Sequence, residues 1–310
     1  MPPPDRTGPL RSGGAVAAVR SGPATVAAAV PIRPSDRTGE PFLEPVVDVA
    51  THVGPLLLPA GDQVITRVLQ NGGVWETQET AYLIMTLLPG QTFVDIGAHV
   101  GYFSVLASKR VGPTGTVIAF EPEARNLDLL ERNLWRNGCG NAVVVPHACS
   151  DRSEALSLVL DEENRGAHYL VPPGHGDVAV SCVRPDQVLP DAVDVVKIDA
   201  QGYDHEVVSG LSRTWTACPD LVIMVELSYG ELDRRGIEPV VVLGGYEEMG
   251  FELAMFDAGG HLPVMPAEAI DAVCRTLQQA DITVVLHRKD GAVRGEREVE
   301  QALPPFGGTR

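Results

Sequence analysis

The run of residues 93–104, FVDIGAHVGYFS, constrains the fold more than any other part of this chain. It begins as a short apolar stretch typical of a buried strand, and it continues through Asp95, Gly97 and Gly101 into the predicted start of a helix. A strand that enters a helix through a glycine-rich turn presents free backbone N–H groups and lets the backbone approach a ligand closely. The glycine spacing differs from the G-x-G-x-x-G pattern of dinucleotide-binding enzymes. The run therefore predicts a ligand-binding β–α turn, with an ordinary structural turn as the alternative.

A second predicted strand, residues 117–120, ends in Glu121 and Pro122. The separation between Asp95 and Glu121 is the length that one β–α unit needs. A carboxylate at the end of such a second strand can accept hydrogen bonds from both ribose hydroxyls of a bound nucleoside. The alternative is that Glu121 is a solvated loop acid. The apolar spacing after residue 122 predicts a helix that Gly138 ends.

Further apolar runs continue this alternation of strands and helices. Nearly continuous apolar runs are expected of parallel strands that helices cover on both faces. The alternation predicts an open α/β sheet with right-handed crossovers. A helix is predicted over residues 239–249, and a loop with a helix over residues 262–280. The further strands are predicted at residues 142–149, 193–200, 220–227, 251–256 and 282–287.

These motifs, taken in order, resemble those of the FkbM-type methyltransferases, which use S-adenosylmethionine (SAM). That family combines a D-I-G-A-x-x-G-Y-x-S turn, an F-E-P step, an S-D pair after the third strand and K-I-D-x-x-G after the fourth. The resemblance covers roughly residues 54–230, and Trp75-Glu76 and Gly210 are also similar. The four matching segments are residues 95–104, Phe120-Glu121-Pro122, Ser150-Asp151 and residues 197–202.

The resemblance implies a fold, a cofactor and a set of contacts. The fold is the α/β class I methyltransferase fold, a Rossmann-like three-layer sandwich. Its seven-stranded sheet is mostly parallel, in the order 3-2-1-4-5-7-6, and the last strand is antiparallel. The cofactor is SAM. The residues placed at the cofactor are Asp95, Gly97, Ala98, His99, Gly101, Tyr102, Ser104, Glu121, Pro122, Ser150, Asp151 and Asp199.

The chain departs from the family pattern at three positions. His99 stands where the family usually has Asn, and Gln201 and Asp204 stand where it usually has Glu. His99 is expected to change little at the cofactor, because that turn binds mainly through its backbone. Gln201 removes a negative charge near the expected active site, so a metal or base role at that position is in doubt.

Catalytic candidates follow the fourth and fifth predicted strands, whose ends face the region of the sheet where ligands bind. Asp199 is the first choice and His205 the second, because His titrates near neutrality and can act as a base. Asp199 and Glu226 could share Mg²⁺, an ion that prefers oxygen ligands. We prefer the interpretation without a metal, since only two carboxylates are visible and Gln201 is neutral.

Three other histidines have less definite roles. His147 lies within the third predicted strand and is interpreted as a packed core residue. His168 and His175 flank a Pro- and Gly-containing loop, and they could line the entrance of a substrate site. Trp75 could pack on the cofactor or substrate, or simply anchor the helix that follows it.

The leading functional hypothesis is a SAM-dependent O-methyltransferase that acts on a hydroxyl of a small molecule. The resemblance suggests sugars, polyketides or other secondary metabolites as acceptors. One alternative is an NAD-linked oxidoreductase, which would share the strand, glycine turn and acid. A second alternative is a SAM-binding scaffold without catalytic activity, for which Gln201 is the only indication.

Composition limits the partners and the organisation of the chain. We place one methyltransferase domain at residues 45–289, with flexible tails at residues 1–44 and 290–310. The net charge of −17 disfavours nucleic acid, because an acidic body repels phosphate backbones. The lack of an 18-residue apolar run argues against a membrane span. Five cysteines without C-x-x-C spacing indicate a reducing compartment, hence the cytoplasm, and association into a homo-oligomer is left open.

Overall fold

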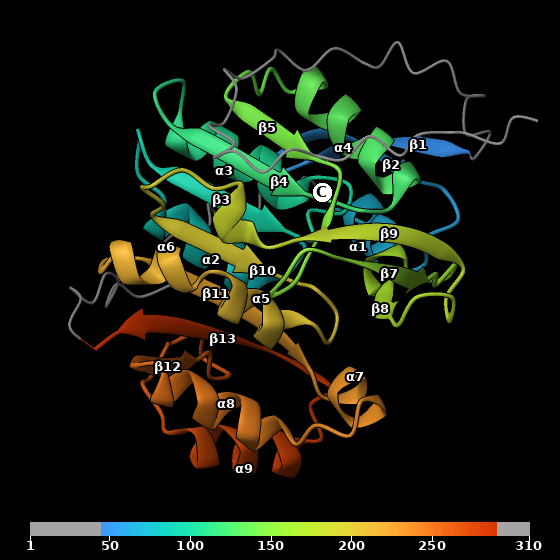
Figure 1. The fold of residues 1–310 in the computed structure, drawn as a ribbon. Helices are drawn as coiled ribbons and strands as arrows, with labels where there is room; N and C mark the ends of the chain where they lie inside the picture. Colours follow the sequence, from blue (N-terminus) through green and yellow to red (C-terminus); the bar gives the residue numbers. More distant parts are fainter. Residues whose placement is uncertain (1–44, 290–310) are drawn as a thin grey trace, which may run out of the picture.

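A computed structural model describes residues 45–289 of the 310-residue chain, so both predicted tails lie outside the described residues. The central sheet has the strand order β12-β13-β11-β10-β3-β4-β5 (Figure 1). Numbered along the chain, this is the predicted order 3-2-1-4-5-7-6. Six strands run in the same direction, and only β13 runs in the opposite direction. The strands are β3 (Thr92–Ile96), β4 (Thr116–Phe120), β5 (Ala142–Val145), β10 (Val195–Ile198), β11 (Val222–Ser228), β12 (Phe251–Met255) and β13 (Asp281–Arg288).

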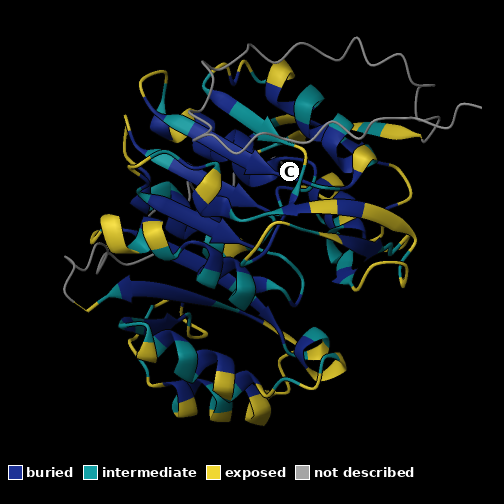
Figure 2. Cartoon of the chain, viewed as in Figure 1, coloured by how far each residue is buried: buried dark blue, intermediate teal, exposed yellow. Residues whose placement is uncertain are grey.

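Alternate residues of the central strands enter hydrophobic cores on the two faces of the sheet. Phe93 and Val195 lie in one core, whereas Val94 and Val196 lie in the other. Helices α2, α3 and α4 supply the first core, and α5, α8 and α9 supply the second, which gives the predicted three layers. Figure 2 shows the strands as the buried centre of the molecule. The helices are α2 (Thr77–Thr86), α3 (Tyr102–Val111), α4 (Ala124–Arg136), α5 (Asp204–Gly210), α6 (Ser212–Ala217), α7 (Tyr229–Arg234), α8 (Pro239–Glu248) and α9 (Ala267–Leu277).

A second sheet, which was not predicted, lies beside the end of β5. The predicted third strand ends early because Pro146 cannot donate a ladder hydrogen bond, and the chain turns there. His147 N–H donates to the Val145 carbonyl across this turn. Residues 148–183 then form strands in the order β6-β9-β7-β8. Their bounds are β6 (Ala148–Cys149), β7 (Glu154–Val159), β8 (Tyr169–Val171) and β9 (Val178–Val183), with 3-10 turns η1 (Arg165–Ala167) and η2 (Pro185–Gln187).

A hairpin of β1 (Val46–Thr51) and β2 (Gly54–Pro59), followed by α1 (Ile65–Gln70), precedes the central sheet. The buried amide of Asn133, on α4, holds this hairpin in place. Its Nδ2 donates to the carbonyl oxygens of Leu57 and Val100 at 3.0 and 2.8 Å, and its Oδ1 accepts the Leu57 N–H at 2.7 Å. One side chain therefore joins β2 and α4 to the turn that follows β3.

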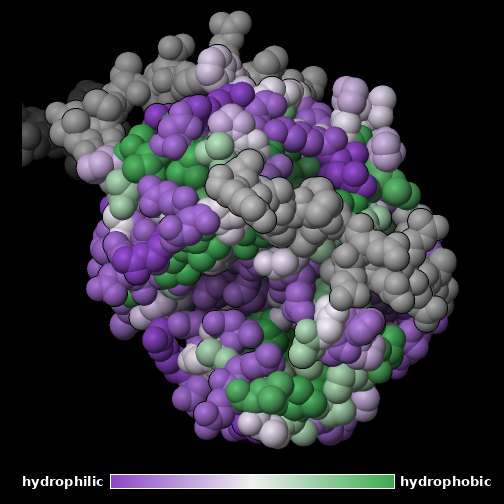
Figure 3. All heavy atoms as spheres, turned by 180° about the vertical axis from the view of Figure 1, so that it is seen from behind, coloured by the Kyte–Doolittle hydropathy of each residue, from purple (hydrophilic) through white to green (hydrophobic). Residues whose placement is uncertain are grey.

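The surface is predominantly hydrophilic, with hydrophobic patches between the polar residues on the face seen in Figure 3. Within residues 45–289, the helices are all too short or too polar to cross a membrane. The five cysteines all lie in this range and are unpaired thiols. The reducing compartment inferred from the sequence stays a prediction.

Candidate functional site

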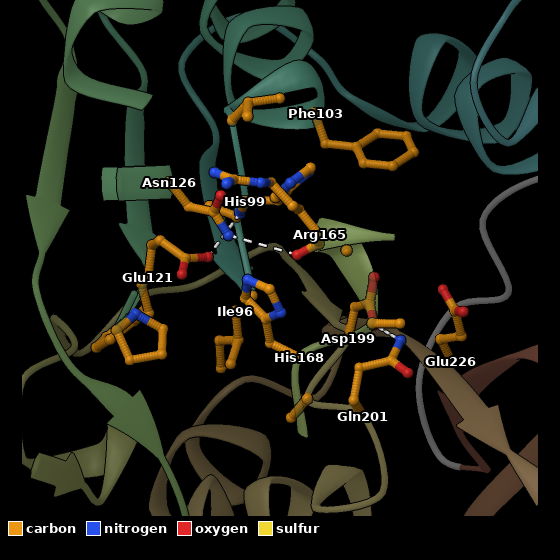
Figure 4. Close-up of a pocket in the computed structure, with 18 of the residues that line it drawn as sticks. Ile96, His99, Phe103, Glu121, Asn126, Arg165, His168, Asp199, Gln201 and Glu226 are labelled. Carbon is orange, nitrogen blue, oxygen red and sulfur yellow. Dashed lines mark hydrogen bonds between the residues drawn. The ribbon is translucent and has the colours of Figure 1, made fainter. Parts of the chain in front are cut away.

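A cavity of about 290 Å³ lies where β3, β4, β10 and β11 end. This volume is at the lower end of the range for small-molecule sites, which is about 300–1,000 Å³. Figure 4 shows Glu121 at one end of the cavity, and Asp199 with Glu226 at the other. The cavity therefore spans the switch region of the sheet, where open α/β folds bind ligands.

Seven of the predicted cofactor residues and two further candidates line this cavity. The turn after β3 with the start of α3, the end of β4 and the end of β10 supply the seven, and the segment after β10 and strand β11 supply the other two. These residues are Gly97, Ala98, His99, Tyr102, Glu121 and Pro122, together with Asp199, which was predicted for both roles, and Gln201 and Glu226.

The turn after β3 can be built only with glycine at its first position. Gly97 has φ 82°, and a Cβ there would lie 1.9 Å from the Asp199 carbonyl oxygen. The N–H groups of Gly97 and Ala98 both donate to the Phe120 carbonyl, at 3.0 and 2.9 Å. Those two N–H groups are therefore not free for a ligand, contrary to the prediction, because they join β3 to the end of β4.

Glu121 is buried at the carboxyl end of β4. Its Oε2 accepts the His99 N–H at 2.8 Å, and its Oε1 accepts the Glu123 N–H at 2.9 Å. Burial raises the pKa of Glu121 to about 8, although these two backbone donors lower it. The carboxylate is thereby fixed in orientation, and it lines the cavity next to Pro122 and Asn126.

Asp95 and Ser104 were predicted to contact the cofactor, but they lie beneath the turn and do not line the cavity. Asp95 is only 1% exposed, and its Oδ2 accepts the Ser104 hydroxyl at 2.5 Å. Gly101, which is also outside the lining, begins α3 with φ 90°. The hydrogen bond between Ser104 and Asp95 joins α3 to β3, and Gly101 allows the chain to enter α3.

Ser150 and Asp151 also lie outside the cavity lining. The Ser150 hydroxyl is 3.3 Å from Asp151 Oδ1 and 3.2 Å from Glu154 Oε1, and the Ser150 N–H donates to the Val183 carbonyl. The break at Pro146 redirects the chain, so these residues connect β6 to β7 in the second sheet instead of ending a strand of the central one.

His205, the second catalytic candidate, is directed away from the cavity and does not line it. The Asp204 carboxylate accepts the N–H groups of Ala200 and Gly202 at 2.6 and 2.9 Å, which fixes the first turn of α5. One residue further along the helix, the His205 Nδ1 lies 3.0 Å from Glu206 Oε2. The helix start therefore directs this imidazole to Glu206, and the prediction of a base at this position is not supported by the geometry.

The end of the cavity opposite Glu121 holds three carboxyl groups and one ammonium. Oxygens of Glu76, Asp199 and Glu226 lie within 4.8 Å of one another. Lys197 Nζ lies 3.3 Å from Asp199 Oδ2 and 3.6 Å from Glu76 Oε2. It is also 4.7 Å from the centre of the Phe103 ring, so a cation–π contact holds it from α3.

This cluster does not fit a Mg²⁺ site. Mg²⁺ needs near-octahedral oxygen ligands at about 2.0–2.1 Å. The buried Lys197 ammonium already lies beside two of the three carboxyl groups and would repel a second cation there. The interpretation without a metal, preferred from the sequence, is the one that the charges of this cluster favour.

Two acids of the cluster and its lysine have shifted pKa values. Burial raises the pKa of Glu76 to about 7, against the attraction of Lys197. Burial, followed by the charge of Asp199, raises the pKa of Glu226 well above its ordinary value. Burial also disfavours the charged form of Lys197, but Glu76 and Asp199 outweigh it, so its pKa is raised and it stays an ammonium.

The sequence was compared with known proteins and families. The family described as Methyltransferase FkbM domain matches residues 95–280, which is more than half of the chain. This chain belongs to the FkbM methyltransferase family. The oxidoreductase alternative is dropped, because the family is one of methyltransferases.

Individual relatives are more distant. The curated protein Methyltransferase sdnD of Sordaria araneosa is 26% identical, over 54% of this chain and 76% of that protein. The solved structure of a methyltransferase FkbM from Methylobacillus flagellatus is 14% identical, with a TM-score of 0.41, over 64% of this chain and 44% of that one. A SAM-dependent methyltransferase from Aquifex aeolicus is 14% identical, with a TM-score of 0.38, over 67% and 88% of the two chains. The family assignment therefore rests on the sequence match.

The departures from the family pattern have visible structural consequences. Gln201, at φ 44°, donates from Nε2 to Asp199 Oδ1 at 2.7 Å, a bond that an ionised Glu could not donate. His99, at φ 51°, keeps a buried Nε2 that has no hydrogen-bond partner among the described residues. Burial lowers the pKa of His99 to about 4, so this imidazole is neutral.

Several cavity residues were not predicted as site residues. Glu76 and Lys197 both lie within segments that resemble the family pattern, so the sequence could have marked them as site residues. The buried Arg165 comes from η1, and no motif marks it. Its N–H donates to Asp62 Oδ2 at 3.1 Å, and its Nη2 donates to Glu162 Oε2 at 3.3 Å.

Two of the three remaining histidines line the cavity. His147 was interpreted as a core residue, but it is half-buried and lines the cavity, because Pro146 turns the chain out of the sheet. His168 lines the cavity as predicted, and its Nδ1 accepts the Asp161 N–H at 2.9 Å. His175 is exposed and lies outside the lining.

Proposed function

We propose that this FkbM-family methyltransferase transfers the methyl group of SAM to a hydroxyl of a small molecule, such as a sugar, a polyketide or another secondary metabolite. The observation that carries the proposal is one cavity that joins Glu121 to the cluster of Glu76, Asp199 and Lys197. The first end suits a nucleoside and the second suits a polar acceptor.

The residues of the cavity would have separate roles in binding the cofactor and in orienting the acceptor. The oriented carboxylate of Glu121 would accept the ribose hydroxyls, and Gly97 and Ala98, which line the cavity, would form the wall beside the cofactor. SAM supplies a methyl group on a sulfonium. Asp199, held by Gln201 and Lys197, would orient the amino group of the cofactor or the acceptor.

The acceptor proposal also has support from charge. The cluster end of the cavity carries three carboxyl groups against one ammonium, and the whole chain has a net charge of −17. Such a site disfavours a phosphate-bearing acceptor, because like charges repel. We therefore propose a neutral hydroxylated small molecule and no nucleic acid as the acceptor.

Isotope transfer tests the proposal. The protein is incubated with SAM labelled on its methyl group and with pools of sugars, polyketides and phenols, with ribosomal RNA in a parallel reaction. The proposal predicts label in an O-methyl ether of low molecular mass, identified by mass spectrometry. Label in RNA or on nitrogen would contradict it, and cofactor binding without any transfer would favour a non-catalytic scaffold.

A further inference from the structure

We propose that Glu76 is the general base that removes the proton from the acceptor hydroxyl during methyl transfer. This inference rests on the function proposed above and names the residue that performs one of its steps. Sequence reasoning considered Asp199 and His205 for this role. His205 does not line the cavity, whereas Glu76 does, and the Glu76 Oε2 accepts no hydrogen bond from the described residues.

The structural contacts of Glu76 do not account for its strained backbone or for its position in the cavity: its carbonyl accepts the Thr80 N–H at 2.8 Å, and its Oε2 lies 3.6 Å from Lys197 Nζ. Glu76 lines the cavity and precedes α2 with φ 40°, in the left-handed region that a non-glycine residue adopts at a cost of about 1–3 kcal/mol. It occupies the N-cap position, yet its side chain caps no helix N–H. Its Oε2 is buried and accepts no hydrogen bond from the described residues. Strained residues of this kind are concentrated at functional sites.

The other two carboxyl groups of the cluster are less suited to the role. Asp199 accepts hydrogen bonds on both oxygens, from Gln201 Nε2 at 2.7 Å and from Lys197 Nζ at 3.3 Å. Burial and the charges of Asp199 and Glu76 raise the pKa of Glu226 well above its ordinary value, so its proton is held more tightly than that of an ordinary carboxyl group. Glu76 is thus the carboxyl group of the cluster that has an oxygen without a hydrogen bond and a pKa of about 7.

The charged groups around Glu76 come from three elements. Lys197 on β10 favours the ionised form, whereas Asp199 after β10, Glu226 on β11 and Glu79 on α2 oppose it. With burial included, the pKa of Glu76 is about 7. A base works best when its pKa lies near the operating pH, so this balance suits proton removal at neutrality.

The proposed step balances in atoms and charge. The acceptor O–H bond breaks, and its proton moves to a carboxylate oxygen of Glu76. The acceptor oxygen forms a bond to the methyl carbon of SAM, while the carbon–sulfur bond breaks and its electron pair stays on sulfur. The products are a methyl ether, S-adenosylhomocysteine and a protonated Glu76, which then loses its proton to water.

A base in this role must lie next to the transferred methyl group, and this can be tested without the acceptor. Sinefungin carries an ammonium in place of the methylsulfonium, whereas S-adenosylhomocysteine carries neither. Calorimetry gives the affinity of both ligands for the wild type, Glu76→Gln and Glu79→Gln. Glu79 is the matched control, since it lies on the same helix outside the cavity and its Oε1 accepts the Thr283 hydroxyl.

We expect Glu76→Gln to reduce the preference for sinefungin over S-adenosylhomocysteine about tenfold, since a charge-assisted hydrogen bond is lost. The affinity for S-adenosylhomocysteine should stay within about twofold. Glu79→Gln should keep the affinity for S-adenosylhomocysteine and should not lower the affinity for sinefungin, because the charge of Glu79 only opposes the ionisation of Glu76. Glu76→Asn, which tolerates φ 40° better, covers the case in which Glu76→Gln does not fold.

An unchanged sinefungin preference in either Glu76 variant would overturn the inference and leave the proposed function intact. Failure of the wild type to bind S-adenosylhomocysteine would instead refute the proposed function, and the inference with it. Once an acceptor is in hand, Glu76→Gln should lower turnover by about 10²–10⁴-fold and remove the rise of kcat/KM through pH 7.

Discussion

At the scale of single residues, the site depends on how burial and neighbouring charges determine the pKa of each acidic side chain. Glu121 is buried and Glu76 and Glu226 are half-buried, and burial raises the pKa of all three carboxyl groups. They differ in their partners. Glu121 accepts two backbone N–H groups, whereas Glu76 faces one ammonium among several acids.

Cofactor affinity should depend on pH through Glu121. Two ribose hydroxyls donate most strongly to an ionised carboxylate, so below its pKa of about 8 binding must first remove a proton. Affinity for S-adenosylhomocysteine should therefore rise from pH 6 to pH 8, by at most about tenfold per unit, and then level off. Calorimetry at several pH values measures this. Glu121→Gln should bind weakly and without this slope, and a flat wild-type profile would contradict the assignment.

Lys197 should stabilise the protein more at high pH than at low pH. The pKa of Glu76 is higher in the folded protein than its ordinary 4.5, so its contribution to stability is full below pH 4.5 and is lost as the pH rises through 7. Lys197→Met removes the compensating ammonium. We expect it to cost about 3 kcal/mol at pH 8 and clearly less at pH 5, measured by urea unfolding.

The control for this variant is Lys109→Met. Lys109 is exposed, and it donates to Val53 and Asn137, away from the acidic cluster. Its loss should have the same small effect at both pH values. Equal costs of Lys197→Met at pH 5 and pH 8 would show that the ammonium does not balance these carboxyl groups.

At the scale of elements, the site exists because β3 and β10 end side by side. Their register pairs Asp95 with Lys197 and Ile96 with Ile198, so the turn after β3 meets Asp199 directly. The Asp199 N–H donates to the Ile96 carbonyl at 2.9 Å. Glycine at position 97 is what allows this approach.

Gly97→Ala should test that approach, with Gly138→Ala as its matched control. Both glycines have positive φ, 82° and 69°, but a Cβ at Gly97 would meet the Asp199 carbonyl, whereas one at Gly138 meets nothing within 4 Å. We expect about 1 kcal/mol of destabilisation at Gly138 and about 3 kcal/mol or more at Gly97, with loss of cofactor affinity only at Gly97. Equal costs in thermal unfolding would refute the close contact.

The elements differ in how far the sequence could predict them. The central strands are continuous apolar runs because both faces are buried, and the predicted order is confirmed. The second sheet was not predicted, since β6 has only two residues and β8 only three, too short for a readable period. Pro146 was a visible signal, and its effect on the third strand was underestimated.

The site was predictable only in part, for a related reason. Glu121 and Asp199 follow strands of the sheet, so their meeting at one edge can be predicted from topology. Glu76 enters the cavity from the residue before α2. Arg165 enters it from η1, between two strands of the unpredicted second sheet. His205 was misplaced because one step along a helix turns a side chain by about 100°.

At the scale of the whole molecule, the chain combines a family fold with an acidic body and one cavity that extends across the ends of four strands. The sheet order places Glu121 at one end of this cavity and the acidic cluster at the other, the ends proposed above to bind the nucleoside and the acceptor. The second sheet adds Arg165 and His168 to the lining, so it forms a wall of the cavity. The identity of the cofactor is the claim on which every proposal depends.

The most direct measurement is calorimetric titration with S-adenosylhomocysteine, with NADH as the comparison ligand and Glu248→Gln, an exposed position on α8, as the control variant. We predict saturable binding of S-adenosylhomocysteine by the wild type and by Glu248→Gln, no binding of NADH, and loss of binding in Glu121→Ala. Binding that survives in Glu121→Ala, or a wild type that binds NADH instead, would contradict the account.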